Sequence, residues 1–199
     1  MVNWYIFSCF NMKNAIIFHG TGGHPQENWF PWLKVELEKL GYTVMIPQFP
    51  TPNNQTPETW FKVFSNYEKE LNPETILIGH SLGGGFLLRV LEHIKTKVKA
   101  AFFVAAPIGV LPIKYYEGDK PFIGKPFDWA KIRQKAEKFF VFHADKDELV
   151  SPGNGEELAK NLGVDLILVP GAGHFNAKAG YTKFELILKR ITEELQMRE

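Results

Sequence analysis

The amino-acid sequence has little cysteine, no long apolar run and almost no excess of charge. Its 199 residues include one cysteine, Cys9, which excludes an internal disulfide and is typical of a reducing, cytoplasmic compartment. No apolar run approaches the length of a membrane span, so no transmembrane segment is expected. The formal net charge is +1, from 23 basic and 22 acidic residues, which argues against a nucleic-acid partner or an electrostatic membrane anchor. The substrate therefore need not be highly charged.

The first eleven residues are apolar and aromatic, but they are not typical of a secretory signal. They carry no basic segment and no small-residue cleavage site. Because Met12 stands just before the first clear strand pattern, residues 1–11 are predicted to be an N-terminal extension, either upstream of the natural start or an extra edge strand. The chain is 45% hydrophobic and 14% aromatic, so residues 12–199 are expected to form one domain around one core.

Strand and helix patterns alternate from residue 12 onward, which predicts an α/β fold. The expected architecture is a single domain with a mostly parallel six-stranded sheet, covered by helices on both faces. One helix is expected directly after the third strand, and the others at about 29–40, 57–71, 128–136, 155–162 and 184–195. The expected strands cover residues 15–18, 42–46, 76–78, 98–104, 139–142 and 165–169.

Residues 105–127 form the longest irregular connection and are rich in proline, glycine and aromatic side chains. A plain connection between elements is shorter, so this segment is predicted to be a small lid or a wall of the pocket. A surface excursion that packs only for stability is the alternative.

A GHSLG pentapeptide occupies positions 79–83, between an apolar strand pattern and a helical pattern. In a G-x-S-x-G turn the serine has a strained backbone, and the glycines are needed because a Cβ atom there would collide with the neighbouring strand and helix. The hydroxyl of Ser81 is thereby directed out above the sheet, which favours a nucleophile. The alternative is an ordinary turn in which Ser81 only caps the following helix.

A serine nucleophile needs a base to take its proton and an acid to orient that base. His174 is the expected base, because it lies in a glycine-containing loop and completes the chain order Ser, Asp, His. Asp147 is preferred as the acid over Asp145, since an apolar pair and then a proline follow it in DELVSP. The carboxyl ends of parallel strands meet at one edge of a sheet, so these groups are expected to lie together there.

The oxyanion formed during acyl transfer needs two backbone N–H donors. Leu82, directly after the serine, is predicted to supply one of them. Thr21, in the glycine-rich loop after the first strand, is predicted to supply the other, with Gly22 as the fallback. The same loop does not fit a dinucleotide site, because Pro25 stands at the third glycine position of G-x-G-x-x-G.

No metal site is expected at the acidic loop, because no histidine or cysteine lies at ligand spacing beside it. The remaining histidines have weaker claims to chemistry than His174. His93 is expected on an exposed helix face and His143 at a strand end, while His24 and His80 are expected to line the pocket or to be structural.

Aromatic residues near these motifs are candidates for the wall of an acyl pocket. Core packing between helix and sheet is at least as good an interpretation for each of them. The candidates are Trp29, Trp32, Phe122, Trp129 and Phe175.

Five segments together carry a resemblance to a known family: HGTGG and the following NWFPWL within 19–33, GHSLGG at 79–84, PFDWAKI at 126–132, DKDELVSP at 145–152 and GAGHF at 171–175. Through them the chain resembles the small α/β-hydrolases of the retinoblastoma-binding-protein and YdeN type, over nearly all of residues 12–190. The resemblance implies a serine hydrolase active on small ester-type substrates, with the triad on Ser81, Asp147 and His174. The retinoblastoma-pocket motif L-x-C-x-E is absent, so the resemblance does not support that protein partner.

The sequence therefore predicts a cytoplasmic serine hydrolase that needs no cofactor or metal. The predicted activity is that of a carboxylesterase, which cleaves small acyl esters through a Ser-His-Asp triad and an acyl-enzyme. Cleavage of amides or thioesters by the same triad is one alternative, and a non-catalytic binding protein that kept the fold is another. The expected partner is a small ester-type molecule, and a protein partner is left open.

Overall fold

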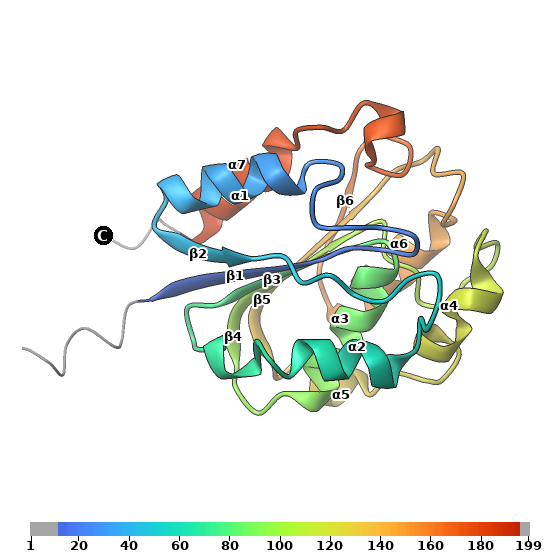
Figure 1. Cartoon of the computed structure of the whole chain (residues 1–199). Coiled ribbons are helices and arrows are strands. Elements are labelled where there is room, and N and C mark those ends of the chain that lie inside the picture. Colours follow the sequence, from blue (N-terminus) through green and yellow to red (C-terminus); the bar gives the residue numbers. More distant parts are fainter. Residues whose placement is uncertain (1–11, 196–199) are drawn as a thin grey trace, which may run out of the picture.

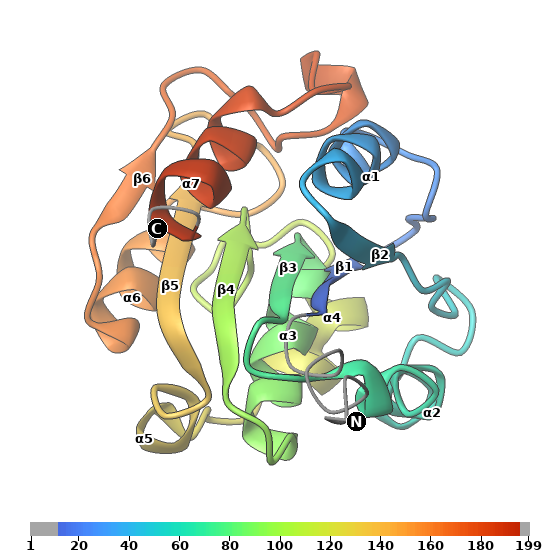
Figure 2. The same ribbon diagram turned by 90° about the vertical axis from the view of Figure 1, so that its left-hand side faces the viewer.

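A parallel sheet of six strands forms the centre of the molecule. The computed structural model describes residues 12–195, so the predicted extension at 1–11 lies outside the described residues. The strand order is β2-β1-β3-β4-β5-β6 and every neighbouring pair is parallel, which confirms the expected sheet (Figure 2). The strands are β1 (Lys13–Phe18), β2 (Tyr42–Met45), β3 (Ile76–His80), β4 (Val98–Val104), β5 (Ala136–His143) and β6 (Leu166–Leu168).

Helices cover both faces of the sheet (Figure 1). One buried layer contains side chains of α1 and α7, and the other contains side chains of α2, α3, α4, α5 and α6. Two short 3-10 turns, η1 (Glu68–Glu70) and η2 (Ala177–Ala179), lie in connections. The helices are α1 (Phe30–Lys39), α2 (Pro57–Phe64), α3 (Leu82–His93), α4 (Tyr116–Ile123), α5 (Trp129–Ile132), α6 (Gly153–Leu162) and α7 (Glu185–Leu195).

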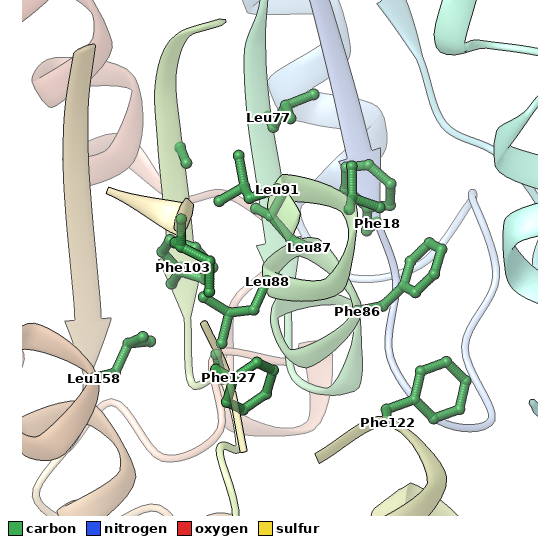
Figure 3. Close-up of a cluster of buried hydrophobic side chains, with 14 of the residues drawn as sticks. Phe18, Leu77, Phe86, Leu87, Leu88, Leu91, Phe103, Phe122, Phe127 and Leu158 are labelled. Carbon is green, nitrogen blue, oxygen red and sulfur yellow. The ribbon is translucent and has the colours of Figure 1, made fainter. Parts of the chain in front are cut away.

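The central strand β3 shows why the sequence has an uninterrupted apolar run at this point. Successive side chains of a strand point to opposite faces. Ile76 and Ile78 enter the layer under α1 and α7, while Leu77 enters the layer under α3. Figure 3 shows this second layer, in which Leu87 and its α3 neighbours pack between the sheet and the surrounding helices. Both faces of β3 are therefore buried, and the strand holds the start of α3 at the middle of the sheet.

The helix expected over 57–71 is interrupted, so the prediction of one continuous helix is wrong here. α2 ends at Phe64, and η1 follows after a turn. The side chains of Ser65 and Asn66 donate hydrogen bonds to backbone carbonyls three residues earlier, at 2.9 and 3.1 Å. These side chains occupy acceptors at the end of the helix, which favours termination at this point.

The boundary between α5 and β5 also differs from the expectation. The helix expected over 128–136 covers only Trp129–Ile132, and β5 begins at Ala136 instead of at residue 139. The first half of β5 pairs with the start of β4, although it carries the polar residues Glu137 and Lys138. These polar side chains hide the strand pattern in the sequence, because backbone pairing does not depend on them.

Residues 105–127, which we call the wall segment, contain α4 and are held on the domain by contacts on either side of that helix's start. The backbone N–H of Lys114 donates to the carbonyl oxygen of Leu149 at 2.8 Å. The Phe122 side chain is fully buried against Trp60 and Phe86. The segment is therefore packed onto the body of the domain.

Candidate active site

Ser81 stands at the turn between β3 and α3, with a backbone φ of 53°. Residues other than glycine rarely adopt this left-handed region. A Cβ atom on Gly79 would lie 2.6 Å from the Cα of Gly84, and a Cβ atom on Gly20 would lie 2.7 Å from the Cβ of Ser81. The expected strained turn is therefore present, and the loop after β1 approaches Ser81 so closely that it needs a glycine.

His174 lies against the carboxylate of Asp147. Its Nδ1 is 2.8 Å from Oδ2 and 3.0 Å from Oδ1, and Oδ1 also accepts the backbone N–H groups of Leu149 and Val150 at 2.8 and 3.0 Å. Burial raises the pKa of Asp147, but the hydrogen bond and charge of His174 and the two N–H donors outweigh it, so this pKa lies below its ordinary value. Asp147 is thus an ionised acceptor for Nδ1–H, which leaves Nε2 as the basic nitrogen of His174.

Asp145, two residues earlier, makes a different contact. It is exposed, and its Oδ1 accepts the backbone N–H of Gly171 at 2.6 Å. Asp145 therefore fastens the glycine loop that carries His174, while Asp147 meets the imidazole itself.

Ser81 and His174 line the same cavity, which has a volume of about 270 Å³. The cavity lies at the carboxyl end of the sheet, where loops after β1, β3, β5 and β6 converge. A serine hydroxyl, an imidazole and a glycine-rich loop are the groups that acyl transfer needs. The remaining lining residues are Gly20, Thr21, Glu27, Asn28, His80, Tyr115, Leu149, Asn176 and Lys178.

His19 fixes the loop that follows β1. Its Nε2 accepts the backbone N–H of Phe49 at 2.9 Å, and its Nδ1–H donates to the carbonyl oxygen of Gly20 at 2.9 Å. Burial lowers the pKa of His19, so the ring is neutral at neutral pH and these two partners determine its tautomer. A buried side chain thus holds the loop that carries Thr21.

Thr21 is also tied to the wall segment. Its hydroxyl donates to Oδ1 of Asp119 in α4 at 2.6 Å. The side-chain amide of Gln55 donates from Nε2 to Thr21 Oγ1 at 3.2 Å and to Asp119 Oδ1 at 3.3 Å. Asp119 is only 3% exposed, and burial raises its pKa above the ordinary value despite these two donors. A buried carboxylate therefore links the wall segment to the loop beside Ser81.

His80, which precedes the serine, supports the backbone of His174. Its Nε2–H donates to the carbonyl oxygen of His174 at 2.8 Å, and the two ring centres are 5.0 Å apart. Burial, followed by the nearby charge of His174, lowers the pKa of His80 to about 3. His80 is therefore neutral at neutral pH, and it both lines the cavity and holds the loop of His174.

His143 supports the acidic loop in a similar way. Its Nε2–H donates to the carbonyl oxygen of Val150 at 3.0 Å, and a Cβ atom on Gly155 of α6 would lie 2.6 Å from the His143 Cβ. Burial lowers the pKa of His143, so a neutral ring fills the space beneath Asp147. This strand-end histidine keeps the acidic loop in place.

The five aromatic candidates for the pocket wall pack in the core and do not line the cavity at the serine. Trp29 and Phe175 are fully buried, and the Trp29 Nε1–H donates to the Phe175 carbonyl oxygen at 3.0 Å. Trp32 packs against the same layer, under α1 and α7, while Phe122 and Trp129 belong to the other layer. The physical reason is that the two buried layers on the faces of the sheet need large apolar side chains to fill them.

Sequence reasoning missed several polar side chains that line the cavity, among them Tyr115, Asn176 and Lys178. Tyr115 lies in the segment that was expected to form a pocket wall, and the other two follow His174 closely. Proximity to His174 was the available signal, but the sequence alone does not show which of these side chains face the cavity.

Within residues 12–195, no group of three or more histidine, cysteine, aspartate or glutamate side chains could hold a metal ion. In the same range, no helix is both long enough and apolar enough to cross a membrane.

Known proteins are similar to this chain along almost its whole length. The hydrolase-named protein YdeN of Bacillus subtilis (strain 168) is 28% identical over 180 residues, which cover 90% of this chain and 95% of YdeN. The crystal structure of the B. subtilis ydeN gene product matches with a TM-score of 0.85 over 92% of this chain and 98% of that one. The serine hydrolase RBBP9 of Rattus norvegicus is 24% identical over 184 residues, covering 91% and 97%.

The fold is therefore that of the α/β-hydrolases, in a single domain. A model of the serine hydrolase family matches residues 15–193. On this match the chain belongs to the serine hydrolase family and is an enzyme of that class.

Proposed function

We propose that this serine hydrolase is a carboxylesterase that cleaves small acyl esters through Ser81, His174 and Asp147. The observation that carries the proposal is the 2.8 Å contact of His174 Nδ1 with buried Asp147, beside a cavity that Ser81 also lines. The Pyrococcus furiosus esterase Pf2001 has the same fold, with a TM-score of 0.65 at 20% identity.

In the proposed reaction, the Ser81 hydroxyl attacks the acyl carbon while Nε2 of His174 takes its proton. Asp147 stabilises the imidazolium that forms. The bond between the acyl carbon and the alcohol oxygen then breaks, and the alcohol leaves with the proton from His174. A water molecule attacks the acyl-enzyme with His174 again as the base, which releases the acid and restores Ser81.

The oxyanion of the tetrahedral intermediate is proposed to bind the backbone N–H groups of Thr21 and Leu82. Gly22, the alternative donor, already donates its N–H to Thr51 Oγ1 at 2.6 Å. Neither Thr21 nor Leu82 donates its backbone N–H within the hydrogen-bond network of residues 12–195. Loss of one such donor typically costs about 3 kcal/mol of transition-state stabilisation.

The size of the cavity supports a small acyl group. Its volume of about 270 Å³ is below the range of about 300–1,000 Å³ that is common for drug-sized ligands. Amide or thioester cleavage would use the same groups. The preference of the enzyme among these bonds is therefore measured by comparing the turnover of p-nitrophenyl butyrate with that of the matched p-nitroanilide and thioester. We expect the ester to be turned over fastest.

The test of the proposal is the Ser81→Ala variant. We expect kcat for p-nitrophenyl butyrate to fall by about 10⁴-fold or more, because the nucleophile is lost. Ser65→Ala is the matched control, since Ser65 is exposed and its hydroxyl bonds only to the Lys62 carbonyl oxygen. Undiminished turnover by Ser81→Ala would contradict the proposal.

A further inference from the structure

Three lysine side chains from separate parts of the chain surround His174. Lys114 belongs to the wall segment, Lys146 lies between Asp145 and Asp147, and Lys178 lies in η2. All three line a cavity of about 400 Å³ that also contains His174, and Lys178 in addition lines the cavity of the serine. The two cavities adjoin, since they share Tyr115, Leu149, His174, Asn176 and Lys178, and we call them together the cleft.

The three ammonium groups are exposed, and none forms an ion pair with a carboxylate of residues 12–195. Lys114 only approaches the ring of Tyr115, at 5.6 Å from its centre. Outside the Asp147–His174 pair, the cleft is lined by two carboxylates, Glu148 and Glu27. These two carboxylates face three lysine ammonium groups. The cleft therefore carries an excess of positive charge, although the chain as a whole is close to neutral.

The lining of the cleft also fits a polar substrate. Apart from the glycines, its apolar side chains are Leu149 and Ala179, and the aromatic side chain is that of Tyr115. Asn28 and Asn176 add amide groups at the cavity of the serine. An anion would find several hydrogen-bond donors here.

We infer that this hydrolase selects esters that carry a carboxylate, and that Lys114, Lys146 and Lys178 bind this carboxylate while the ester carbonyl lies at Ser81. The inference rests on the proposed function and names the substrate class of the same site. Lysine suits this role because a compact ammonium on a flexible stem can meet an anion in several positions. Unpaired cations around a cleft also attract anionic substrates over a distance and raise the association rate.

The experiment compares pairs of esters that differ only in the charged group. On the acyl side, the p-nitrophenyl monoester of adipic acid is compared with p-nitrophenyl hexanoate, which has the same number of acyl carbons. On the leaving-group side, a carboxylated nitrophenyl acetate is compared with p-nitrophenyl acetate. The measured quantity is the ratio of kcat/KM for the anionic ester to kcat/KM for its neutral partner.

We expect the wild-type enzyme to prefer the anionic ester in at least one pair. Each exposed ion pair contributes about two- to five-fold, so the triple variant Lys114→Gln, Lys146→Gln, Lys178→Gln should lower the ratio by about ten-fold or more. Added salt should lower the ratio of the wild-type enzyme as well, because exposed charges are screened.

The matched control is the triple variant Lys62→Gln, Lys97→Gln, Lys131→Gln, which removes the same charge from exposed lysines that do not line the cleft. This control should keep the wild-type ratio. If the wild-type enzyme prefers the neutral ester in both pairs, or if the two triple variants have equal ratios, the anionic selectivity is wrong while the esterase proposal stands. If the wild-type enzyme hydrolyses none of the four esters and a fluorophosphonate does not label Ser81, both proposals fail.

Discussion

The acidic loop at 145–150 and the wall segment each bury one aspartate near His174, and the pKa values of these two aspartates are shifted in opposite directions. Asp147 accepts hydrogen bonds from two backbone N–H groups and from His174, and its pKa lies below the ordinary value of 3.8 although burial raises it. Asp119 meets only the Thr21 hydroxyl and the Gln55 amide, and burial keeps its pKa above 3.8.

The difference shows that burial alone does not decide the state of a carboxylate. A charged acid is stabilised where several donors and a cationic partner point at it, and it is destabilised where the donors are few and neutral. The acidic loop is therefore built to keep a charge beside the imidazole. The wall segment uses its carboxylate mainly as a hydrogen-bond acceptor for the loop beside Ser81.

The largest expected effect is a difference in kcat between variants of the two aspartates in the acidic loop, Asp145 and Asp147. Asp147→Asn should lower kcat for p-nitrophenyl butyrate by about 10⁴-fold, because an amide does not hold His174 in the required tautomer. Asp145→Asn should lower kcat less than about ten-fold, since one exposed hydrogen bond to the glycine loop is weakened. Equal losses in steady-state kinetics would contradict the role given to Asp147.

The next effect is on the free energy of unfolding, when a methyl group is added under the acidic loop or in the wall segment. Gly155→Ala places a methyl group against His143 under the acidic loop and should lower the free energy of unfolding by about 1–3 kcal/mol. Gly118→Ala in α4 is the matched control, because its Cβ would meet only Gln55 Nε2, at 3.6 Å. We expect this control to be neutral or to stabilise by up to about 1 kcal/mol, as alanine favours helix. Urea unfolding measures both, and a greater loss in Gly118→Ala would reverse the comparison.

A smaller effect is expected when the acceptor at Asp119 is removed. Asp119→Ala leaves the Thr21 hydroxyl and the Gln55 amide without their shared acceptor. A lost hydrogen bond of about 1 kcal/mol corresponds to about a five-fold lower kcat if it orients the proposed oxyanion donor. Asp119→Asn keeps an acceptor oxygen and should retain most of the activity. If the asparagine variant is as impaired as the alanine variant, the charge of Asp119 matters and the acceptor role is wrong.

The smallest effect is the pH dependence of stability, which should differ in sign between the two aspartates. The lowered pKa of Asp147 contributes stability that is present above pH 3.8 and is lost as the pH falls through the folded-state pKa. The raised pKa of Asp119 has the opposite consequence. Ionisation of Asp119 is less favourable in the folded state than in the unfolded chain, so the free energy of unfolding falls as the pH rises above 3.8.

Urea unfolding between about pH 3 and pH 7 tests this contrast, with Asp147→Asn and Asp119→Asn each compared with the wild type. The stability advantage of the wild type over Asp147→Asn should shrink as the pH falls. Its advantage over Asp119→Asn should instead shrink as the pH rises. Parallel curves for the two variants would contradict the contrast.

The local parts of the site are the ones that the sequence predicts well. The turn at Ser81 depends on sterics within a few residues, and the structure has the strained serine and the crowded glycines that GHSLG indicates. The parallel sheet follows from alternating strand and helix patterns, and it is confirmed. The preference for Asp147 over Asp145 came from spacing, and the structure adds the contact with His174.

Features that depend on distant parts of the chain were not predictable in the same way. Trp29 and Phe175 were named as pocket candidates because they adjoin the motifs, yet their side chains turn into the core. Lys114 and Lys178 meet at one cleft only because the wall segment and the turn after His174 fold toward each other. No pattern in the sequence shows this convergence, since 63 positions separate the two lysines.

The most direct test of the central claim is covalent labelling of the native enzyme by a fluorophosphonate, with the modified residue located by peptide mass spectrometry. We expect one adduct, on Ser81, and much slower labelling of Asp147→Asn, because the serine is activated through His174. An unlabelled wild-type enzyme, or an adduct on another residue, would contradict it.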